Sequence, residues 1–518
     1  DVVRRRLARL PEATQRLLAV AAVVGRDVEL ALLARAAGQD IDAVVDDLDP
    51  AVVQRLLVPV PELTGTVRFA HALVREVVVD DVSALRRART HLRIADAIAA
   101  TAADDDDAAE ILAEHLWAAA PVGVGQRAAE ALERAAEVAV RRFAFEAAEG
   151  MLERAVQLRR SAAGAAEGVQ PELTAACRLL SLQRSLHGYA SVGGSPLLRR
   201  AIELARRAGD DEVLARLLWT EWAAHDSRCD VERSLALAER LHALGEGSDI
   251  PLVRVAGLAS LGVARWHRGR IAEAAALLDV AVAAARGAPP PAMSMGLDLE
   301  VMLLPVPFSH HLHVLVGDLG PPEGEAAFEA LAGAAPDRYA IPIVEMLAAA
   351  AALLVGEPAW AERAARRGVE ADPESRFTFW GRGLQAFLAA ARVELGDGGA
   401  RLPRLDEAVD AFVGAGGRTG VPVHLATRAA GLVAAGRLDE AAAAVADAHR
   451  EVEALGERYA VPLVLEAEAR LRVARGDPDA AADLLGRAVE EARAQGARAV
   501  AARVERVGRT GHERRDEE

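Results

Sequence analysis

Apolar residues recur at helical spacing along most of the chain, from about residue 108 onward. The stretch "WHRGRIAEAAALLDVAVAAAR" from Trp266 contains a helix end, a Gly turn and a second helix rich in Leu and Ala. The same order recurs in "VAAGRLDEAAAAVADAHREVEALG" from Val433 and in "VARGDPDAAADLLGRAVEEARAQG" from Val473. Glycine ends the first helix of each pair, and small side chains on the second helix let a neighbour approach closely. The pattern therefore predicts stacked helical hairpins.

Residues 104–508 are accordingly predicted to be tetratricopeptide-like helical repeats. Looser copies begin at Phe143 and Leu354, so we expect a curved α-solenoid of roughly ten helix pairs with about 34 to 40 residues each. The concave surface of such a solenoid binds peptides, other subunits or small effectors and seldom performs chemistry. We expect a protein or small-molecule effector on this concave repeat surface.

The first hundred residues have a shorter and more varied pattern. "VVRRRLARLPEATQRLLAVAAVVG" predicts two helices, and residues 28–37 and 41–54 predict two more. "RLLVPVPELTGTVRFAH" then alternates apolar residues around Pro59, Pro61 and a Thr-Gly turn, which indicates a small β-hairpin. Residues 1–103 are therefore predicted to be a winged-helix module and a connecting helix. The fold class that we expect for the whole chain is all-α, apart from this hairpin.

Charge argues against nucleic-acid binding by this module. Its candidate recognition helix carries only Arg55 at its end, together with five acidic residues: Asp40, Asp42, Asp46, Asp47 and Asp49. Such a face repels phosphate. Four successive aspartates at 104–107 indicate a solvated linker, and the charged ending "GRTGHERRDEE" predicts a disordered tail over residues 509–518. We expect no direct nucleic-acid contact by this chain.

Composition excludes some functions. The 518 residues have a net charge of −16 and are 52% hydrophobic, but they contain no lysine. A Schiff-base lysine is therefore impossible, and so is a phosphate-binding loop of the form G-x-x-x-x-G-K-[ST]. "GYASVGGSPLL" imitates the start of such a loop, but Gly194 stands at the lysine position. The chain is thus expected to hold no nucleotide cofactor by itself.

Localisation follows from the cysteines and from the length of the apolar runs. Cys177 and Cys229 match no zinc or redox spacing, which favours a reducing, cytoplasmic setting and core positions for both thiols. Apolar runs are shorter than the about 20 residues that a membrane span needs. The chain starts at Asp1 rather than at Met, and we interpret it as a piece of a longer protein.

Two groups of residues are candidates for a ligand site. His310, His311 and His313 could in principle hold a transition metal, but His311 points away from the other two on a helix, and no familiar carboxylate or thiol spacing accompanies them. An irregular insertion beside an effector pocket is the alternative for this stretch. Core packing is the favoured role of five tryptophans, with pocket lining as the alternative: Trp219, Trp222, Trp266, Trp360 and Trp380. No catalytic motif stands out, so the chain is predicted not to be an enzyme.

Three stretches carry a resemblance to a known family. They are "VVRRRLARLPEATQRLLAVAAVVGRDVELALLARAAG", "RFAHALVREVVVDDVSALRRARTHLRIADAIA" and "ARLRVARGDPDAAADLLGRAVEEARAQGARAVAARVERV". The chain resembles the region downstream of the nucleotide-binding domain in STAND-class signalling ATPases. Among these it looks like the large ATP-binding LuxR-type transcriptional regulators related to the maltose regulator. The third stretch is similar to the repeats that precede the C-terminal helix-turn-helix of that family.

The resemblance implies a switch and a role for one histidine. In such ATPases ADP holds the nucleotide-binding domain, winged helix and repeat arm closed, and effector binding with ATP exchange opens the molecule for self-assembly. "FAHALVRE" is similar to their Met-His-Asp motif, whose histidine approaches the β-phosphate. The resemblance therefore makes His71 a nucleotide-phosphate sensor in the intact protein, although Ala70 and Ala72 depart from the motif. A histidine that caps the following helix is the alternative.

The predicted function is the non-catalytic regulatory portion of an ATP-dependent transcriptional regulator. Its winged-helix module is expected to pack on the protein's own nucleotide-binding domain, which would bind ATP or ADP and make the intact protein an ATPase. Two alternatives stay open. The first is the same region of a nucleotide cyclase or kinase-like signalling enzyme, and the second is a stand-alone protein-interaction scaffold.

Overall fold

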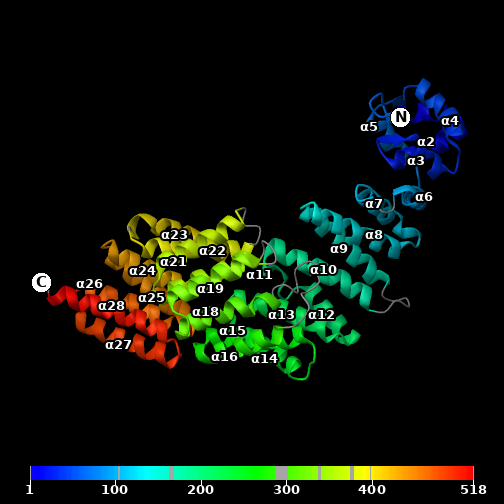
Figure 1. Ribbon diagram of the computed structural model, residues 1–518. Helices are drawn as coiled ribbons and strands as arrows, with labels where there is room; N and C mark the ends of the chain where they lie inside the picture. Colours follow the sequence, from blue (N-terminus) through cyan, green and yellow to red (C-terminus); the bar gives the residue numbers. More distant parts are fainter. Residues whose placement is uncertain are drawn as a thin grey trace. The chain divides into compact units, whose positions relative to one another are not determined.

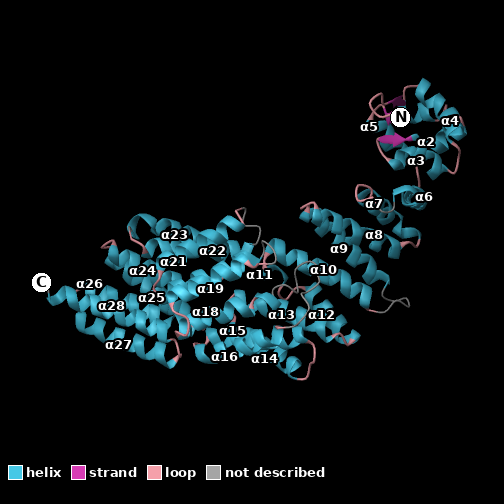
Figure 2. Ribbon diagram, in the orientation of Figure 1, coloured by secondary structure: helices cyan, strands magenta, loops and turns pink. Residues whose placement is uncertain are grey.

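The computed structural model describes residues 2–102, 105–162, 169–286, 301–335, 340–373, 378–396 and 398–516. The chain divides into two compact units, Asp1–Leu179 and Leu180–Glu518 (Figure 1). Helices make up most of both units, and the strands of the described part all lie close to the N-terminus (Figure 2). The domain boundary expected after residue 103 falls inside the first unit and stays a prediction.

The first unit begins with six helices and a small sheet. The helices are α1 (Val2–Leu7), α2 (Glu12–Val24), α3 (Leu30–Ala37), α4 (Ile41–Val53), α5 (Ala72–Asp80) and α6 (Ala84–Ala102). The strands are β1 (Asp27–Glu29), β2 (Leu57–Pro59) and β3 (Thr66–Phe69), and they form an antiparallel sheet in the order β1-β3-β2. Leu18, Leu33 and Phe69 belong to one buried core that α6 completes with Ile94.

The predicted hairpin is present, and a third strand joins it. β2 pairs with β3, with Val58 opposite Arg68, and Gly65 in the connecting turn has a φ of 74°. The sequence predicts that a helix starts at Val28, whereas Val28 lies in β1 opposite Val67 and α3 starts at Leu30. Val28 is fully buried in the sheet, and a β-branched side chain fits such a half-covered strand well.

The rest of the first unit consists of helices that continue past the predicted linker. They are α7 (Ala109–Ala119), the 3-10 turn η1 (Ala120–Val122), α8 (Gly125–Arg141) and α9 (Phe145–Ala162), and α10 (Gln170–His187) leads into the second unit. Asp104 lies outside the described residues. Asp106 accepts a 2.7 Å hydrogen bond from Arg141, and Asp107 pairs with Arg142, at the C-terminal end of α8. Two of the predicted linker aspartates therefore hold α8 rather than remaining only solvated.

The second unit is built from helical hairpins. The first helix of each pair, here called an A helix, is one of α13 (Asp211–Ser227), α15 (Pro251–His267), α18 (Pro305–Val316), α20 (Ala340–Val355), α22 (Thr378–Glu394), α24 (Val421–Ala434) and α26 (Val461–Ala474). Their partners, the B helices, are α14 (Val231–Glu246), α16 (Ile271–Ala285), α19 (Pro321–Gly333), α21 (Pro358–Ala371), α23 (Gly398–Gly414), α25 (Leu438–Leu455) and α27 (Pro478–Ala494). The remaining elements are α11 (Tyr189–Val192), α12 (Pro196–Ala208), η2 (Arg458–Ala460) and α28 (Arg498–Asp516). The solenoid-like repeat expected from the sequence is confirmed.

Glycine turns join the A and B helices where the sequence predicts them. Gly269, Gly436 and Gly476 have φ values of 73°, 72° and 79°, a left-handed conformation that a side chain disfavours. In the described part of the chain, no helix combines the length and apolar character that crossing a bilayer requires. The final helix, α28, runs to Asp516 and so enters the range for which the sequence predicts a disordered tail.

Candidate functional site

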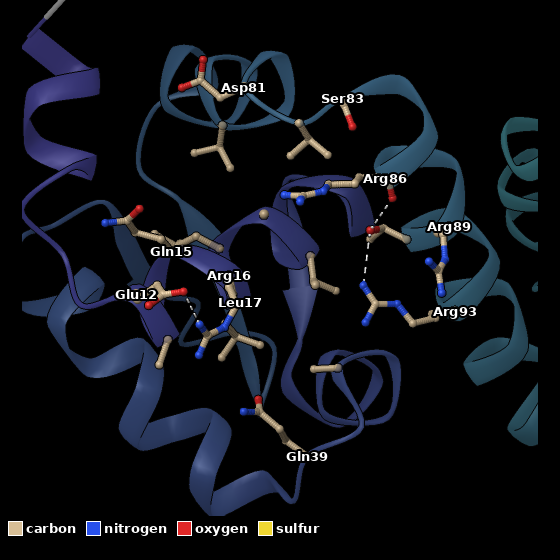
Figure 3. Close-up of a pocket in the computed structure, with 18 of the residues that line it drawn as sticks. Glu12, Gln15, Arg16, Leu17, Gln39, Asp81, Ser83, Arg86, Arg89 and Arg93 are labelled. Carbon is tan, nitrogen blue, oxygen red and sulfur yellow. Dashed lines mark hydrogen bonds and ion pairs between the residues drawn. The ribbon is translucent and has the colours of Figure 1, made fainter.

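A groove on the first unit is lined by side chains of α2, of α6 and of the turn that leads into α6. It has a volume of about 1080 Å³. Figure 3 shows Arg86, Arg89 and Arg93 along α6, and Arg16 on α2. Residues spaced by three and four positions share one face of a helix, so the three α6 arginines form a row. We call this cavity the arginine groove.

The carboxylates around the arginine groove are already paired. Glu12 bonds to Arg16 at 2.7 Å, Asp81 lies 3.1 Å from Arg4, and Asp96 lies 2.8 Å from Arg127.

The row on α6 is different, since its side chains are exposed. Within the described part of the chain, Arg86 and Arg89 have no carboxylate within ion-pair distance, and Arg93 bonds only to the hydroxyl of Thr90, at 3.4 Å. A guanidinium is planar, always charged and well matched to carboxylate or phosphate oxygens. The groove is therefore equipped to bind an anionic partner.

His71 lies at the N-terminal end of α5, as the sequence predicts. It occupies the N-cap position with φ −137° and ψ 137°, but its side chain makes no capping hydrogen bond. The imidazole is exposed rather than packed in the core. The geometry thus gives no support to the capping alternative and leaves the ring accessible, and its role as a phosphate sensor stays a prediction.

The three histidines at 310–313 lie on α18 but serve three different contacts. His310 Nδ1 lies 2.8 Å from the carbonyl oxygen of Val306 in the same helix. His311 is fully buried, and its Nδ1 lies 3.1 Å from the carbonyl oxygen of Leu347 on α20. Burial lowers the pKa of His311 to about 4. This ring is therefore neutral at pH 7 and donates to the carbonyl.

His313 has two carboxylate partners instead. Its Nε2 lies 2.9 Å from Asp279, and its Nδ1 lies 3.1 Å from Asp318. Partial burial opposes protonation, but the two carboxylates outweigh it and raise the pKa of His313. The structure therefore does not bring the three imidazoles to one point, and the metal site weakly suggested by their spacing is not formed.

The five tryptophans named from the sequence are all core residues, as favoured, and each is less than 10% exposed. Trp219, Trp222 and Trp380 also line a small cavity of about 50 Å³ with Phe379 and Tyr189. These three tryptophans therefore pack in the core and also line a cavity.

The interior of the second unit is filled by contacts between residues far apart in the sequence. The backbone N–H of Arg418 donates to the carbonyl of Ser227 at 2.7 Å. The turn after α15 likewise meets the end of α27, since Ile271 N–H donates to the carbonyl of Gln495 at 3.1 Å. At the centre Trp266 stacks on Tyr459, with ring centroids 4.0 Å apart. Contacts between distant turns thus close the interior of the second unit in the described residues, where the sequence predicts an open concave surface.

One group in this interior was missed by the sequence analysis. Cys229, His267 and Glu457 are all buried, and each offers a ligand atom within 4.8 Å of the others. Of the groups of three found among the described residues, this is the only one with a spacing that could hold a metal ion. Burial opposes protonation of His267, but Asp226 and Glu457 outweigh it and raise the pKa of the ring to about 10. Burial and the Glu457 charge raise the pKa of the Cys229 thiol.

Comparison with known proteins gives no family assignment. No family model and no curated protein matches the chain. Among solved structures, a Signal Transduction ATPase with Numerous Domains (STAND) protein with a tetratricopeptide repeat sensor, from Pyrococcus horikoshii, has 13% identity and a TM-score of 0.38. The alignment covers 93% of this chain and 63% of that one, so the chain spans less than two thirds of its length.

Two further solved structures have a similarly low sequence identity and TM-score. A Rap protein in complex with Competence and Sporulation Factor has 11% identity and a TM-score of 0.41, over 67% of this chain and 98% of that one. The APC/C heterotetramer Cut9-Hcn1 has 12% identity and a TM-score of 0.43, over 82% and 76%. With TM-scores below 0.5, these likenesses do not assign the chain to a family.

Proposed function

We propose that this chain is the non-catalytic regulatory portion of a STAND-type, ATP-dependent transcriptional regulator. Its first hundred residues would form a winged-helix module that docks on a nucleotide-binding domain, and its repeats would form an arm that receives an effector or protein partner. The sequence resemblance supports the class. The observation that carries the docking role is the arginine groove, an exposed row of guanidinium groups without carboxylate partners within the described residues.

The geometry of the row favours a protein surface over a single phosphate group. Arg86 and Arg93 are seven residues apart on α6, which corresponds to about 10 Å along a helix axis. Three guanidinium groups over that length match several separate anionic groups, such as the carboxylates of an acidic protein face. The groove is therefore proposed as the docking surface, while the exposed His71 would approach the nucleotide held by the docked domain.

The closed interior of the second unit changes where its partner would bind. Because bonds such as those from Ile271 to Gln495 and from Arg418 to Ser227 fasten distant turns across this interior, an effector or partner protein would contact the B helices and the turns between pairs. This placement keeps the proposed role of the repeats as a binding arm, and it moves the binding surface from the inside of the arm to the outside.

The test uses the nucleotide-binding domain that the proposal places upstream in the same polypeptide, produced separately. We expect the chain to bind this domain by calorimetry with an affinity that falls as salt is raised, and to bind neither ATP nor ADP alone. Replacing Arg86 and Arg89 by Ala should weaken domain binding by about 10-fold or more, since each charge-assisted contact contributes about 1.5–3 kcal/mol.

Arg206 and Arg207 provide a matched control. They are exposed neighbours on α12 of the second unit, so replacing both by Ala removes the same charge from a remote surface. Equal weakening by both double variants would show a nonspecific charge effect and contradict the docking role. A parent gene without a nucleotide-binding domain, or micromolar ATP binding by this chain, would contradict the proposed function as a whole.

A further inference from the structure

Three buried side chains of the second unit meet at one point, although they come from distant turns. Cys229 follows α13, His267 ends α15 and Glu457 precedes η2. Their ligand atoms lie within 4.8 Å of one another, and all three residues are buried. Thiolate sulfur, imidazole nitrogen and carboxylate oxygen are the donors by which proteins bind Zn²⁺.

The backbone at Cys229 is in a conformation that other turns of this unit give to glycine. Cys229 has a φ of 54°, close to the 73° of Gly269 and the 72° of Gly436. The backbone hydrogen bonds of the two turns are also alike. The N–H of Cys229 donates to the backbone carbonyl of Asp226 at 2.8 Å, and the N–H of Gly269 donates to the backbone carbonyl of Trp266 at 2.8 Å. A side chain in this region costs of order 1 kcal/mol. A strained cysteine in place of the turn glycine indicates a role for the thiol.

His267 is held between two carboxylates with an unsatisfied ring. Its Nδ1 lies 3.3 Å from Glu457, and its Nε2 lies 3.2 Å from Asp226. These distances suit ion pairs, yet neither nitrogen makes a well-directed hydrogen bond to a residue that the structure describes, and the side chain is only 1% exposed. The bonding direction of Nδ1 does not point at the Glu457 oxygen, so a ligand placed in that direction would bind Nδ1.

The surroundings of the cluster already orient the carboxylates. Glu457 accepts the backbone N–H of Gly420, at 3.1 and 3.0 Å to its two oxygens, and the hydroxyl of Tyr459 at 3.1 Å. Asp226 accepts a hydrogen bond from the hydroxyl of Ser234 at 3.1 Å. A carboxylate behind the second nitrogen of a histidine is the usual support of a metal-binding imidazole, because it fixes the tautomer and the ring orientation.

We propose that Cys229, His267 and Glu457 bind a divalent transition-metal ion, with Zn²⁺ as the best match to the donor set, and that Asp226 orients His267 from behind. The thiol proton leaves as the metal–sulfur bond forms. The ion would tie together the turns after α13, α15 and α25, which are the turns that close the interior of the unit.

The test is a titration of the full chain with Co²⁺, whose bonds to thiolate give a charge-transfer band in the near ultraviolet. Because the ligands are buried, Co²⁺ is added to the native protein and also during refolding from urea. We expect one Co²⁺ per chain and full displacement of the band by Zn²⁺. The metal content of the protein purified without chelator, by mass spectrometry, gives a second readout.

Cys229→Gly is the informative variant, because glycine suits the turn and should keep the chain folded while it removes the thiol. It should lose the band and weaken binding at least about 100-fold, and Asp226→Asn should weaken binding about 10- to 100-fold. Cys177→Ser is the matched control and should bind as the wild type does. A wild-type chain that binds no Co²⁺ by either route would show that the Asp226–His267–Glu457 contacts are only structural, and would overturn the proposal. A band that survives in Cys229→Gly, or is lost in Cys177→Ser, would do the same.

Discussion

Arg503 donates a hydrogen bond from Nε to Glu466 at 2.9 Å, and both side chains are buried in the second unit. Arg503 also lies 3.2 Å from Glu394 and donates to the carbonyl of Leu353, 150 positions earlier. Burial opposes ionisation of Glu466, but the guanidinium groups of Arg503 and Arg470 outweigh it and lower the pKa of this carboxyl. One side chain of the last helix therefore joins three A helices.

Replacing Arg503 by Ala should lower the free energy of unfolding by about 2–3 kcal/mol, because the buried Glu466 would keep Arg470 as its one remaining guanidinium partner and Glu394 would lose its own. Urea unfolding at pH 7 measures the change. Arg498→Ala is the control, since Arg498 pairs with Asp318 on the surface with both side chains about half exposed or more, and it should cost at most about 1 kcal/mol. Similar losses in the two variants would contradict the buried network.

The close contact between α14 and α15 predicts opposite effects for two glycines. A Cβ on Gly257 would lie 2.7 Å from the Cα of His242 and 2.7 Å from the carbonyl oxygen of Leu241, so the helices would have to separate. Gly257→Ala should destabilise the chain by about 1–3 kcal/mol. Gly486, in α27, has nothing within 4 Å of such a Cβ, so Gly486→Ala should stabilise by about 0.5–1 kcal/mol. Thermal unfolding of both variants tests this contrast, and two shifts of the same sign would contradict it.

Acid sensitivity should come partly from two buried neutral histidines of the second unit. Burial lowers the pKa of His311 and of His424 to about 4 in each case, from 6.5. Between these values the unfolded chain binds protons that the folded chain does not, so stability falls as the pH drops from 6.5 to 4. Each group contributes a slope of about 1.4 kcal/mol per pH unit.

His424→Leu tests this slope at one site. Among the described residues neither ring nitrogen of His424 has a hydrogen-bond partner, and the ring faces Phe387 at 4.8 Å between centroids. The variant should gain about 1 kcal/mol at pH 7, because a buried unsatisfied polar group is removed. Urea unfolding at pH 6.5, 5.5 and 4.5 should also show that the stability of the variant falls less steeply with decreasing pH, because one of the two histidine contributions is gone. An unchanged slope would show that His424 is already protonated or exposed in the folded chain.

His71→Ala should leave stability almost unchanged, because the exposed imidazole makes no capping bond. Ser195→Ala offers the contrast, since the Ser195 hydroxyl accepts the N–H of Leu198 at 3.1 Å at the start of α12, and its loss should cost about 1 kcal/mol. In the intact protein His71→Ala should speed ADP release. A loss of stability as large as that of Ser195→Ala would instead indicate a structural role for His71.

The helical hairpins could be predicted from the sequence because their signals are local. A glycine such as Gly436 marks the turn, and Leu and Ala at helical spacing mark the helices on both sides. The strand at 27–29 could not be predicted in the same way, since its pairing partner is β3, some forty positions later. The closed interior depends in turn on contacts such as that between Cys229 and Thr419, 190 positions apart, and no local pattern contains these.

The candidate sites likewise combine features that are local in the sequence with features that depend on distant residues. The spacing of Arg86, Arg89 and Arg93 in the sequence places them on one face of a helix. Only the structure shows that they have no carboxylate partners within the described part of the chain. The cluster at Cys229, His267 and Glu457 left one local sign, a cysteine where the neighbouring repeats have a turn glycine, and the sequence analysis assigned it to the core. Sequence motifs for metal sites describe ligands within short segments, whereas these three residues come from three separate turns, so no such motif includes them.

The bond from Ile271 to Gln495 has a consequence for how the second unit comes apart. In an open repeat array each pair touches only its neighbours, so terminal pairs can fray or be deleted one at a time. Here an early turn is fastened to one of the last, and α28 is anchored on helices from the middle of the unit. Shortening the chain from its C-terminus would therefore undo the early repeats as well, and the unit would denature in a single all-or-none step.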